Sequence, residues 1–441
     1  MTVLQKVLST RYLKIGREFV WVGIGQAASV IGSLVGLKVL TKMLGASEFG
    51  VLTLALTAPL LLGNFFFAGP GQAVMRFFSA SLEAKQPCEL MQAAWKTMWQ
   101  RTVILVGLVV CVAILMWLTG QSQWWSMSAA ALVYGGFTAF STILDGMQNA
   151  VRQRAVVAWH AGLSQWLRLL FAVVLFLMLG ASAAVAMWGY AIASIIVFSS
   201  QYWQYQRYRH HKLLTQAADH PDRITDWVRR INVYSWPFSV FGIFAWLQSS
   251  SERWGLGIIV NTAAAGQYAA LAQIGLASMA ILSNYLIQMA APVLYSRAGD
   301  GRDHSRRAQA DRINMMLLLA MFIVTLVILV GAGLFHREIF SILVAEDFRD
   351  VSALLPVAVL AGGLLGCGQV ASFIVLTGTE SHPLIIPKSA TAIVTALAVL
   401  VGANLAGISG VIWANVAGAV FYLVLIFIVK SRKRTWCVLS L

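Results

Sequence analysis

The sequence predicts an all-α polytopic membrane protein with about twelve transmembrane helices arranged as two six-helix lobes. Hydrophobic residues make up 59% of the 441 residues and charged residues only 11%, whereas a soluble domain has about 25% charged residues. The apolar residues come in runs of about twenty, which is the length that crosses roughly 30 Å of hydrocarbon as a helix. Closed barrels need short alternating strands, a pattern that does not occur in this sequence.

The predicted spans follow from these apolar runs. They cover residues 19–43, 50–75, 102–118, 127–147, 156–179, 183–203, 233–257, 265–290, 313–334, 353–377, 388–405 and 409–429. The first run is too long for the apolar core of a signal peptide, so we interpret it as a retained span. The four cysteines form no CxxC pair, so we expect no disulfide, metal or other cofactor.

The basic residues predict the orientation, because cytoplasmic loops are enriched in Lys and Arg. With a cytoplasmic N-terminus, only Lys42, Arg337 and Arg349 lie on the outer side. Three more of the 32 Lys and Arg residues lie inside spans, and the remaining 26 lie in cytoplasmic segments. We therefore expect both termini in the cytoplasm. The net charge of +15 sits mostly in short loops, so nucleic acid is not an expected partner.

The longest connection divides the chain at its midpoint. Residues 204–232 carry six basic residues and link two halves, 1–203 and 233–441, which we expect to form an N-terminal and a C-terminal six-helix lobe. An even number of spans gives the two halves the same orientation, as in transporters built from parallel repeats. A shift of 216 residues aligns the loops that follow the first span of each half, with Gly50 and Gly266 identical.

Charges within or at the ends of spans are the candidate functional residues. An ionisable side chain in the membrane costs a few kcal/mol, so it normally faces protein or a water-filled cavity. The candidates for substrate binding and translocation are Lys38, Lys42, Arg76, Arg168, Glu252 and Arg253.

These candidates have different alternative explanations. Lys42 and Arg76 can snorkel to the membrane interfaces, and Glu252 with Arg253 can form a structural pair. Lys38 and Arg168 lie deeper, which favours a cavity. The interior set is net positive and would attract an anion, and guanidinium groups bind phosphate in a bidentate manner.

Catalytic motifs are absent from the sequence, which has no HExxH, GxSxG or P-loop pattern. The longest outer connection covers about residues 335–352, and its acidic residues have the simpler interpretation of a solvated face. We therefore do not expect an enzyme.

Four short motifs resemble those of O-antigen-type polysaccharide flippases. They are Gly-Ala-Ser-Glu-Phe-Gly-Val at 45–51, Ser-Glu-Arg-Trp at 251–254, Ala-Gly-Gln-Tyr-Ala-Ala at 265–270 and Gly-Ile-Ser-Gly-Val at 407–411. The family usually has an Asp-Arg pair followed by Val-Gly-x-Tyr, so this chain departs from the pattern at Glu252 and Ala265. Of the motif positions, Glu252 and Arg253 carry over as candidate functional residues.

The resemblance implies a fold and a function. The family belongs to the superfamily of MATE drug exporters and lipid II flippases, with two six-helix lobes around a central cavity that work by alternating access. The implied substrate is an oligosaccharide on undecaprenyl pyrophosphate, flipped across the bacterial inner membrane for surface polysaccharide biosynthesis. The implied partners are this lipid, membrane lipids, and a polysaccharide polymerase or other assembly proteins. The alternatives are a MATE-like cation or drug antiporter and a membrane glycosyltransferase or ligase.

The orientation can be tested with single cysteines. A cysteine placed at Gln123 or Gly407 should react with an impermeant thiol reagent from outside the cell, and one at Gln216 should not, because the basic residues place only the first two outside. Labelling in the reverse pattern would contradict the predicted topology.

Overall fold

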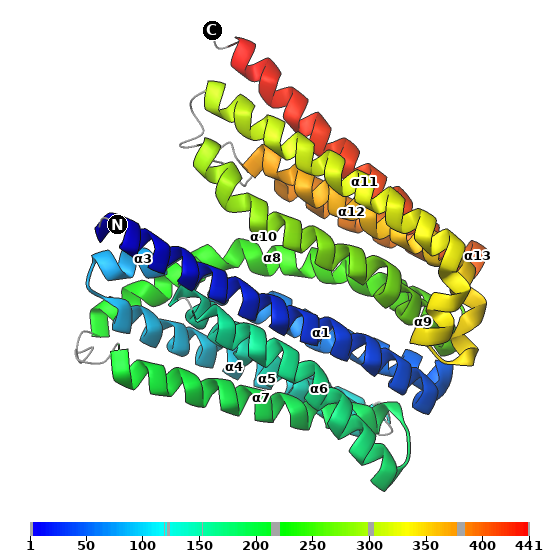
Figure 1. Ribbon diagram of the computed structural model, residues 1–441. Coiled ribbons are helices and arrows are strands. Elements are labelled where there is room, and N and C mark those ends of the chain that lie inside the picture. Colours follow the sequence, from blue (N-terminus) through cyan, green and yellow to red (C-terminus); the bar gives the residue numbers. More distant parts are fainter. Residues whose placement is uncertain are drawn as a thin grey trace. The chain divides into compact units, whose positions relative to one another are not determined.

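The computed structural model describes residues 3–118, 120, 124–151, 153–212, 221–298, 304–376 and 384–439. The regular elements of these residues are helices (Figure 1). Residues 213–220 of the predicted linker and residue 377 of the tenth span lie outside the described part. Apart from residue 377 and a turn at Leu56, the predicted spans fall on helix.

The first half of the sequence forms the elements up to Lys212, and the last of these extends into the predicted linker. They are α1 (Val3–Ala55), α2 (Thr57–Leu62), the π-helix η1 (Gly63–Phe67), α3 (Ala68–Glu83), α4 (Pro87–Leu118), α5 (Trp125–Ala150), α6 (Arg154–Leu179) and α7 (Ala183–Lys212).

The second half has a similar order of elements. They are α8 (Pro221–Ile259), α9 (Thr262–Ala272), the π-helix η3 (Gln273–Ala277), α10 (Ser278–Ala298), α11 (His304–Leu343), the 3₁₀-helix η4 (Glu346–Leu354), α12 (Leu355–Leu376) and α13 (Ile385–Leu439). The last of these contains two predicted spans, separated by a kink at Gly407, whose φ of 56° is in the left-handed region that glycine adopts at little cost.

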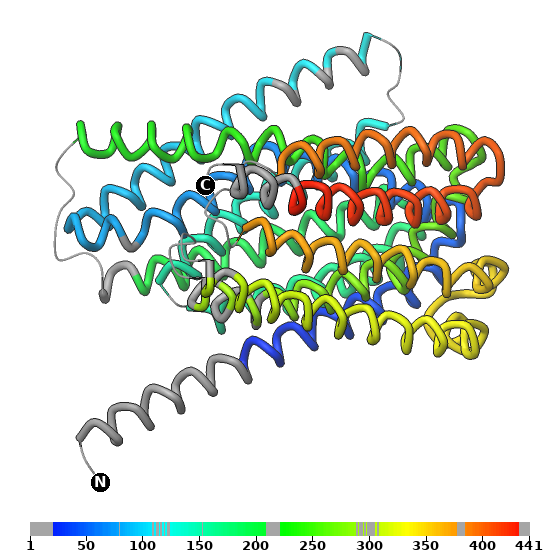
Figure 2. The backbone as a smooth tube through the Cα atoms, turned by 90° about the horizontal axis from the view of Figure 1, so that it is seen from above, coloured from blue at the N-terminus to red at the C-terminus, as the bar shows by residue number. Residues whose placement is uncertain are grey.

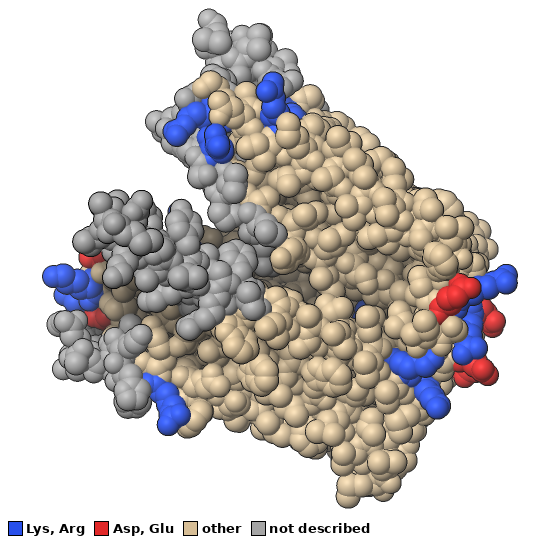
Figure 3. Space-filling model, viewed as in Figure 1, with Lys and Arg blue, Asp and Glu red and all other residues tan. Residues whose placement is uncertain are grey.

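The chain is a multi-pass membrane protein with an all-α fold. Within the described residues, eight helical stretches are long and apolar enough to cross a membrane, and two of them, Trp21–Phe78 and Ile385–Ser431, each contain a pair of predicted spans. On the face shown in Figure 3, charged side chains gather near the ends of the helices and the surface between is almost entirely uncharged. Such an apolar belt is the surface that lipid covers.

Contacts divide the chain into two compact units. The first comprises Met1–Leu40 and Ala55–Trp246, and the second comprises Thr41–Leu54 and Leu247–Leu441. The long helices α1 and α8, each the first of its half, therefore pass from one unit into the other. The segment 41–54, from the first half of the sequence, packs with residues of the second half.

In the first unit, α7 packs against both α5 and α6, and α3 packs against α5. Its core is a cluster of buried apolar side chains that includes Phe67, Leu90, Ile143, Met147 and Tyr205. Small residues allow close approach. A Cβ on Gly189 of α7 would lie 2.6 Å from the backbone nitrogen of Ala172 on α6.

In the second unit, α12 is the central helix and packs against α10, α11 and α13, which run beside it in Figures 1 and 2. Its glycines explain this position. A Cβ would clash with α11 at Gly363, where Thr325 is 2.1 Å away, and with α13 at Gly368, where Tyr422 is 2.4 Å away. The small residues of the tenth span thus serve close helix packing.

The second span of each half is interrupted by a π-helix, a feature that the sequence did not predict. The first, η1, separates α2 from α3, and the second, η3, separates α9 from α10. A π-helix disturbs the regular hydrogen-bond ladder and is often found at functional positions. Arg101 of α4 compensates in the first unit by donating to the Phe66 carbonyl at 2.5 Å and to the Asn232 side chain at 3.2 Å.

Two short helical segments cross reciprocally in the second unit, which we call the glycine crossing (residues 46–50 and 262–266). A Cβ on Gly50 would lie 1.8 Å from the Thr262 carbonyl oxygen, and one on Gly266 would lie 2.2 Å from the Ala46 carbonyl oxygen. The hydroxyls of Ser47 and Thr262 are 2.8 Å apart. The shift of 216 residues maps Ala46 onto Thr262 and Gly50 onto Gly266. Equivalent residues of the two halves therefore make equivalent contacts in the crossing.

The glycine crossing predicts a site-specific loss of stability. Gly50→Ala should destabilise the protein by about 1–3 kcal/mol, the usual cost of overpacking, because the new Cβ meets backbone rather than a flexible side chain. Gly36→Ala, on the same helix with nothing within 4 Å of its Cβ, is the control and should be neutral or stabilising, since alanine is the better helix former. Thermal unfolding in detergent measures both. Equal melting temperatures for the two variants would contradict the packing described here.

Candidate functional site

The six candidate residues are distributed over both compact units. Lys38, Arg76 and Arg168 belong to the first unit, and Lys42, Glu252 and Arg253 belong to the second. Each group is described within its own unit.

Arg168 lies between two tyrosines in the first unit. Its guanidinium carbon is 4.9 Å from the ring centroid of Tyr134 on α5 and 6.0 Å from that of Tyr190 on α7. Its Nε is buried and has no hydrogen-bond partner in the part of the chain that the structure describes. Aromatic faces stabilise a cation without neutralising it, so this arginine keeps both its charge and a donor group for an anion.

Lys38 lies on α1, which packs against the helix that carries Arg168. A Cβ on Gly25 would meet Ala158, and one on Gly32 would meet Gln165 and Trp166. Gly25 and Ala158 are separated by the same number of residues as Gly32 and Gln165, so α1 and α6 run parallel. The same separation places Lys38 of α1 level with residue 171 of α6. At 1.5 Å per residue, Lys38 and Arg168 differ in depth by only about 4.5 Å. The packing therefore places the two deepest predicted cations on neighbouring helices at nearly the same level.

Lys42 and Arg76 are both exposed. Their exposure is compatible with the alternative that these side chains reach the membrane interfaces. The structure places neither of them in a cluster such as those around Arg168 and Glu252.

Glu252 is the centre of a buried polar cluster in the second unit. The residue is only 8% exposed, and its carboxyl shares hydrogen bonds with the side chains of Tyr268 on α9 and Asn415 on α13. The Asn415 amide also donates to the Tyr268 hydroxyl at 2.9 Å. Three helices thus contribute to one polar site, in which a buried carboxyl is compensated by hydrogen bonds.

Arg253 points in a different direction from its neighbour Glu252, since successive residues on a helix are about 100° apart. Its Nη1 donates to the Thr53 carbonyl at 3.5 Å, and its Nε is buried without a hydrogen-bond partner. Glu252 and Arg253 therefore have different partners. Glu252 is hydrogen-bonded to side chains of α9 and α13, whereas Arg253 reaches the segment 41–54.

The sequence interpretation missed three groups of partners. Tyr134 and Tyr190 are single tyrosines in apolar spans, and Asn415 follows a Trp-Ala pair, so nothing local marks them. Asp145, at the cytoplasmic end of the predicted span 127–147, accepts a hydrogen bond from Gln201 at 2.7 Å, and Gln201 also donates to Gln148. A polar residue inside an apolar run is the one signal that could have found them.

Comparisons with known proteins agree with this architecture. A family model described as "Polysaccharide biosynthesis protein" matches residues 15–296, which is well over half of the chain. No curated protein matches the sequence.

Solved structures show the same fold. The lipid II flippase MurJ, in an inward closed conformation, has a TM-score of 0.68 and 12% identity, covering 93% of this chain and 87% of that one. A MATE transporter from Vibrio cholerae, VcmN, has a TM-score of 0.61 and 13% identity, covering 96% and 98%. An outward-facing MATE family transporter of the MOP superfamily has a TM-score of 0.59 and 15% identity, covering 95% and 94%.

Proposed function

The chain belongs to the polysaccharide biosynthesis protein family, and from this premise we propose that it is a flippase for undecaprenyl-pyrophosphate-linked oligosaccharide. It would move this lipid from the inner to the outer leaflet of the bacterial cytoplasmic membrane by alternating access. The observation that carries the proposal is Arg168, a membrane-embedded guanidinium held by two tyrosine rings and not by an acid.

A pyrophosphate is the most difficult part of such a lipid to move through hydrocarbon, because isolated charge is costly there. Positive charge at Arg168 and Lys38 would lower this cost. The buried Nε of Arg168 has no partner among the described residues, and it would become a donor to a phosphate oxygen if the substrate displaced the groups that cover it. The isoprenoid tail is apolar and can stay in the bilayer throughout.

The proposed transport unit has an N-terminal lobe of residues 1–203, a cytoplasmic linker at 204–232 and a C-terminal lobe of residues 233–441 around a central cavity. Both termini are proposed to be cytoplasmic. Arg253, whose buried Nε has no partner among the described residues, is proposed to contact the substrate. Glu252 is proposed to hold the local structure through Tyr268 and Asn415. Lys42 and Arg76 are proposed to meet the headgroup at the membrane interfaces.

We also propose a role for the glycine crossing in alternating access. It joins the first and second halves of the sequence at the loops that we place on the outer side. We propose that it keeps the outer side closed and must separate before the headgroup can leave. Small side chains and one hydroxyl–hydroxyl contact make a contact that is tight and yet low in cost to break.

A cation or drug antiporter is the second candidate. It is favoured by the two hydrogen-bonded span acids, Glu252 and Asp145, since buried carboxylates often mark ion pathways. An antiporter would confer drug resistance in cells and need no lipid-linked sugar. A membrane glycosyltransferase or ligase is the third and weakest candidate, because the outer loops are short.

The charge hypothesis predicts the outcome of conservative and neutral substitutions. Lys38→Arg and Arg168→Lys should retain substantial flipping of labelled lipid-linked sugar in vesicles. Lys38→Gln and Arg168→Gln should lose most of it and be no less stable in detergent, because a neutral group costs less to bury. Arg168→Lys should lose part of the activity with its bidentate geometry.

Arg207→Gln is the matched control, since Arg207 is also a cation over an aromatic ring, 4.2 Å from that of Trp203, but is exposed on α7. It should transport normally. Normal transport by Lys38→Gln and Arg168→Gln, or failure only through misfolding, would reject the cationic site.

The glycine crossing predicts the effect of a cross-link. In a chain with all four native cysteines replaced, Ser47→Cys with Thr262→Cys should form a disulfide, because the native hydroxyls are 2.8 Å apart. Oxidation should reduce flipping to background, and reduction should restore it.

The pair His336→Cys and Ser352→Cys is the control, since these side chains are 3.2 Å apart and both belong to the second half of the sequence, so the proposed movement does not require them to separate. Its oxidation should leave transport intact. Full transport by the fully cross-linked 47–262 protein would show that the crossing does not open.

A further inference from the structure

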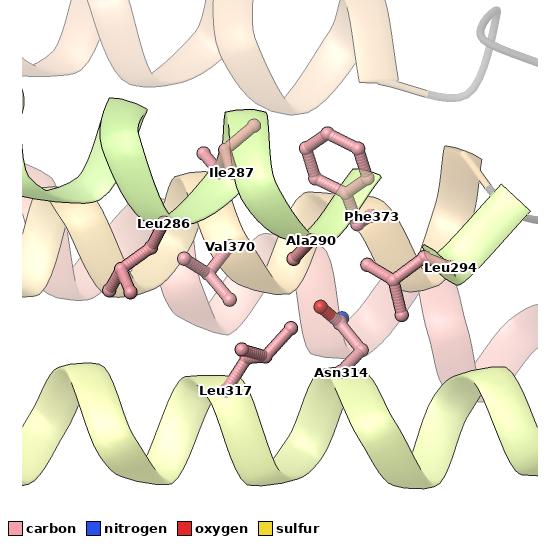
Figure 4. Close-up of a pocket in the computed structure, with 8 residues that line it drawn as sticks. All are labelled: Leu286, Ile287, Ala290, Leu294, Asn314, Leu317, Val370 and Phe373. Atoms are coloured by element: carbon pink, nitrogen blue, oxygen red, sulfur yellow. The ribbon is translucent and has the colours of Figure 1, made fainter. Parts of the chain in front are cut away.

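The cavity in the second unit that Figure 4 draws leaves no room for a ligand. It lies between α10, α11 and α12, its labelled lining includes Leu294, Asn314 and Val370, and its volume is about 10 Å³. This is room for about one water molecule. The contacts that indicate a further role lie at the opposite end of α11, where the chain continues into η4.

The connection after α11 contacts a segment from the first half of the sequence. The backbone N–H of Ala345 donates to the Thr41 hydroxyl at 3.2 Å. The ring of Phe348 in η4 lies edge-on to that of Phe49, with 5.7 Å between the ring centroids. Thr41, Phe49 and Phe348 are at most 4% exposed. Both contacts are therefore buried, and water does not compete with them.

The η4 helix is also attached to the other partner of the glycine crossing. Gln267 of α9, which directly follows the segment 262–266, donates its side-chain amide to the Asp347 carbonyl at 2.8 Å. The same short helix packs against α11 and α12, so most of its contacts are with the second half of the sequence. It therefore rests on the second half and reaches the segment 41–54 of the first half, within the second unit.

Gly45 lies between Thr41 and Phe49 and marks a kink in α1. Its φ of 69° is in the left-handed region, which glycine adopts at little cost. A Cβ at this position would lie 3.8 Å from a carboxylate oxygen of Asp347, so the kink is directly beside η4. The part of α1 after Gly45 can therefore turn away from η4 through a change at one flexible residue.

We propose that residues 345–348 are a latch on the glycine crossing, which holds Thr41 and Phe49 while the crossing is closed and releases them when it opens. The inference rests on the proposed role of the crossing as the contact that closes the outer side. Release breaks one neutral hydrogen bond and one edge-on ring contact and leaves the Gln267 bond to Asp347 in place. The strength of these two contacts then sets how often the outer side opens.

A single cysteine measures how often the crossing opens. In a chain with all four native cysteines replaced, Ala269→Cys places a thiol three residues after Gly266, on the same side of α9. Ala269 is 5% exposed, so a water-soluble maleimide should react with this thiol only when the crossing opens. The reaction rate is followed by mass spectrometry of the full-length protein in lipid nanodiscs, without any lipid-linked sugar.

Phe348→Leu should raise this rate about fivefold, because an edge-on ring contact of about 1 kcal/mol is lost. Thr41→Val should act in the same direction, since it removes the acceptor of the Ala345 N–H at nearly the same shape. Phe176→Leu is the matched control, because Phe176 is also buried, at 5% exposure, but belongs to α6 in the first unit. It should leave the rate unchanged.

Hydrogen exchange gives a second measurement, which serves if Phe348→Leu fails to fold. The Ala345 amide is bonded to a side chain of the segment 41–54, so its exchange in the parent reports release of the latch. In Thr41→Val this amide should exchange at least fivefold faster, while peptides of α5, α6 and α7 in the first unit should exchange as in the parent.

Two results would overturn the latch. One is labelling of Ala269→Cys at the parent rate in both folded variants, together with unchanged exchange at Ala345. The other is an equal rise in labelling with Phe176→Leu, because loss of any buried ring would then explain the effect. Failure of the proposed gate has a different sign, which is full flipping by the protein cross-linked between positions 47 and 262. The two failures are therefore distinguishable.

Discussion

Hydrocarbon supplies no hydrogen-bond partner to a polar group, and this constraint shapes every level of the structure. The backbone satisfies it by forming helices throughout the spans. Where the helix is interrupted, a side chain compensates, as when Arg101 donates to the Phe66 carbonyl within η1. Where a charge enters a span, a specific environment receives it, with tyrosine rings around Arg168 and hydrogen bonds around Glu252.

The repeat in the sequence has a physical basis at the glycine crossing. The backbones of two equivalent segments approach each other closely here. Each segment therefore needs a residue without a side chain at the same position. Gly50 and Gly266 meet this requirement, each against the carbonyl that belongs to the other segment. Elsewhere the halves have diverged, since packing within each half can be solved by many apolar combinations.

Ten of the twelve predicted spans coincide with the eight apolar stretches of the described residues, and the exceptions are 102–118 and 233–257. The agreement arises because each span is a local property of about twenty apolar residues. Arg168 and Glu252 stand out in the sequence as candidates because a charge in an apolar run is visible locally. The sequence could not predict the partners Tyr134, Tyr190 and Asn415, which are brought together only by packing between helices distant in sequence. The π-helices η1 and η3 were missed for the same reason, since residues 63–67 and 273–277 continue ordinary apolar spans.

The polar groups inside the spans differ in how completely the protein itself satisfies them. Glu252 has two hydrogen-bonding side chains, and Asp145 has Gln201, so these groups are stable without a ligand. Arg168 is held by rings, and among the described residues neither its Nε nor that of Arg253 has a hydrogen-bond partner. Since an unpaired buried group costs free energy that apolar replacement would avoid, its retention needs a compensating interaction. The two arginines are therefore where the proposed substrate phosphate would find donors.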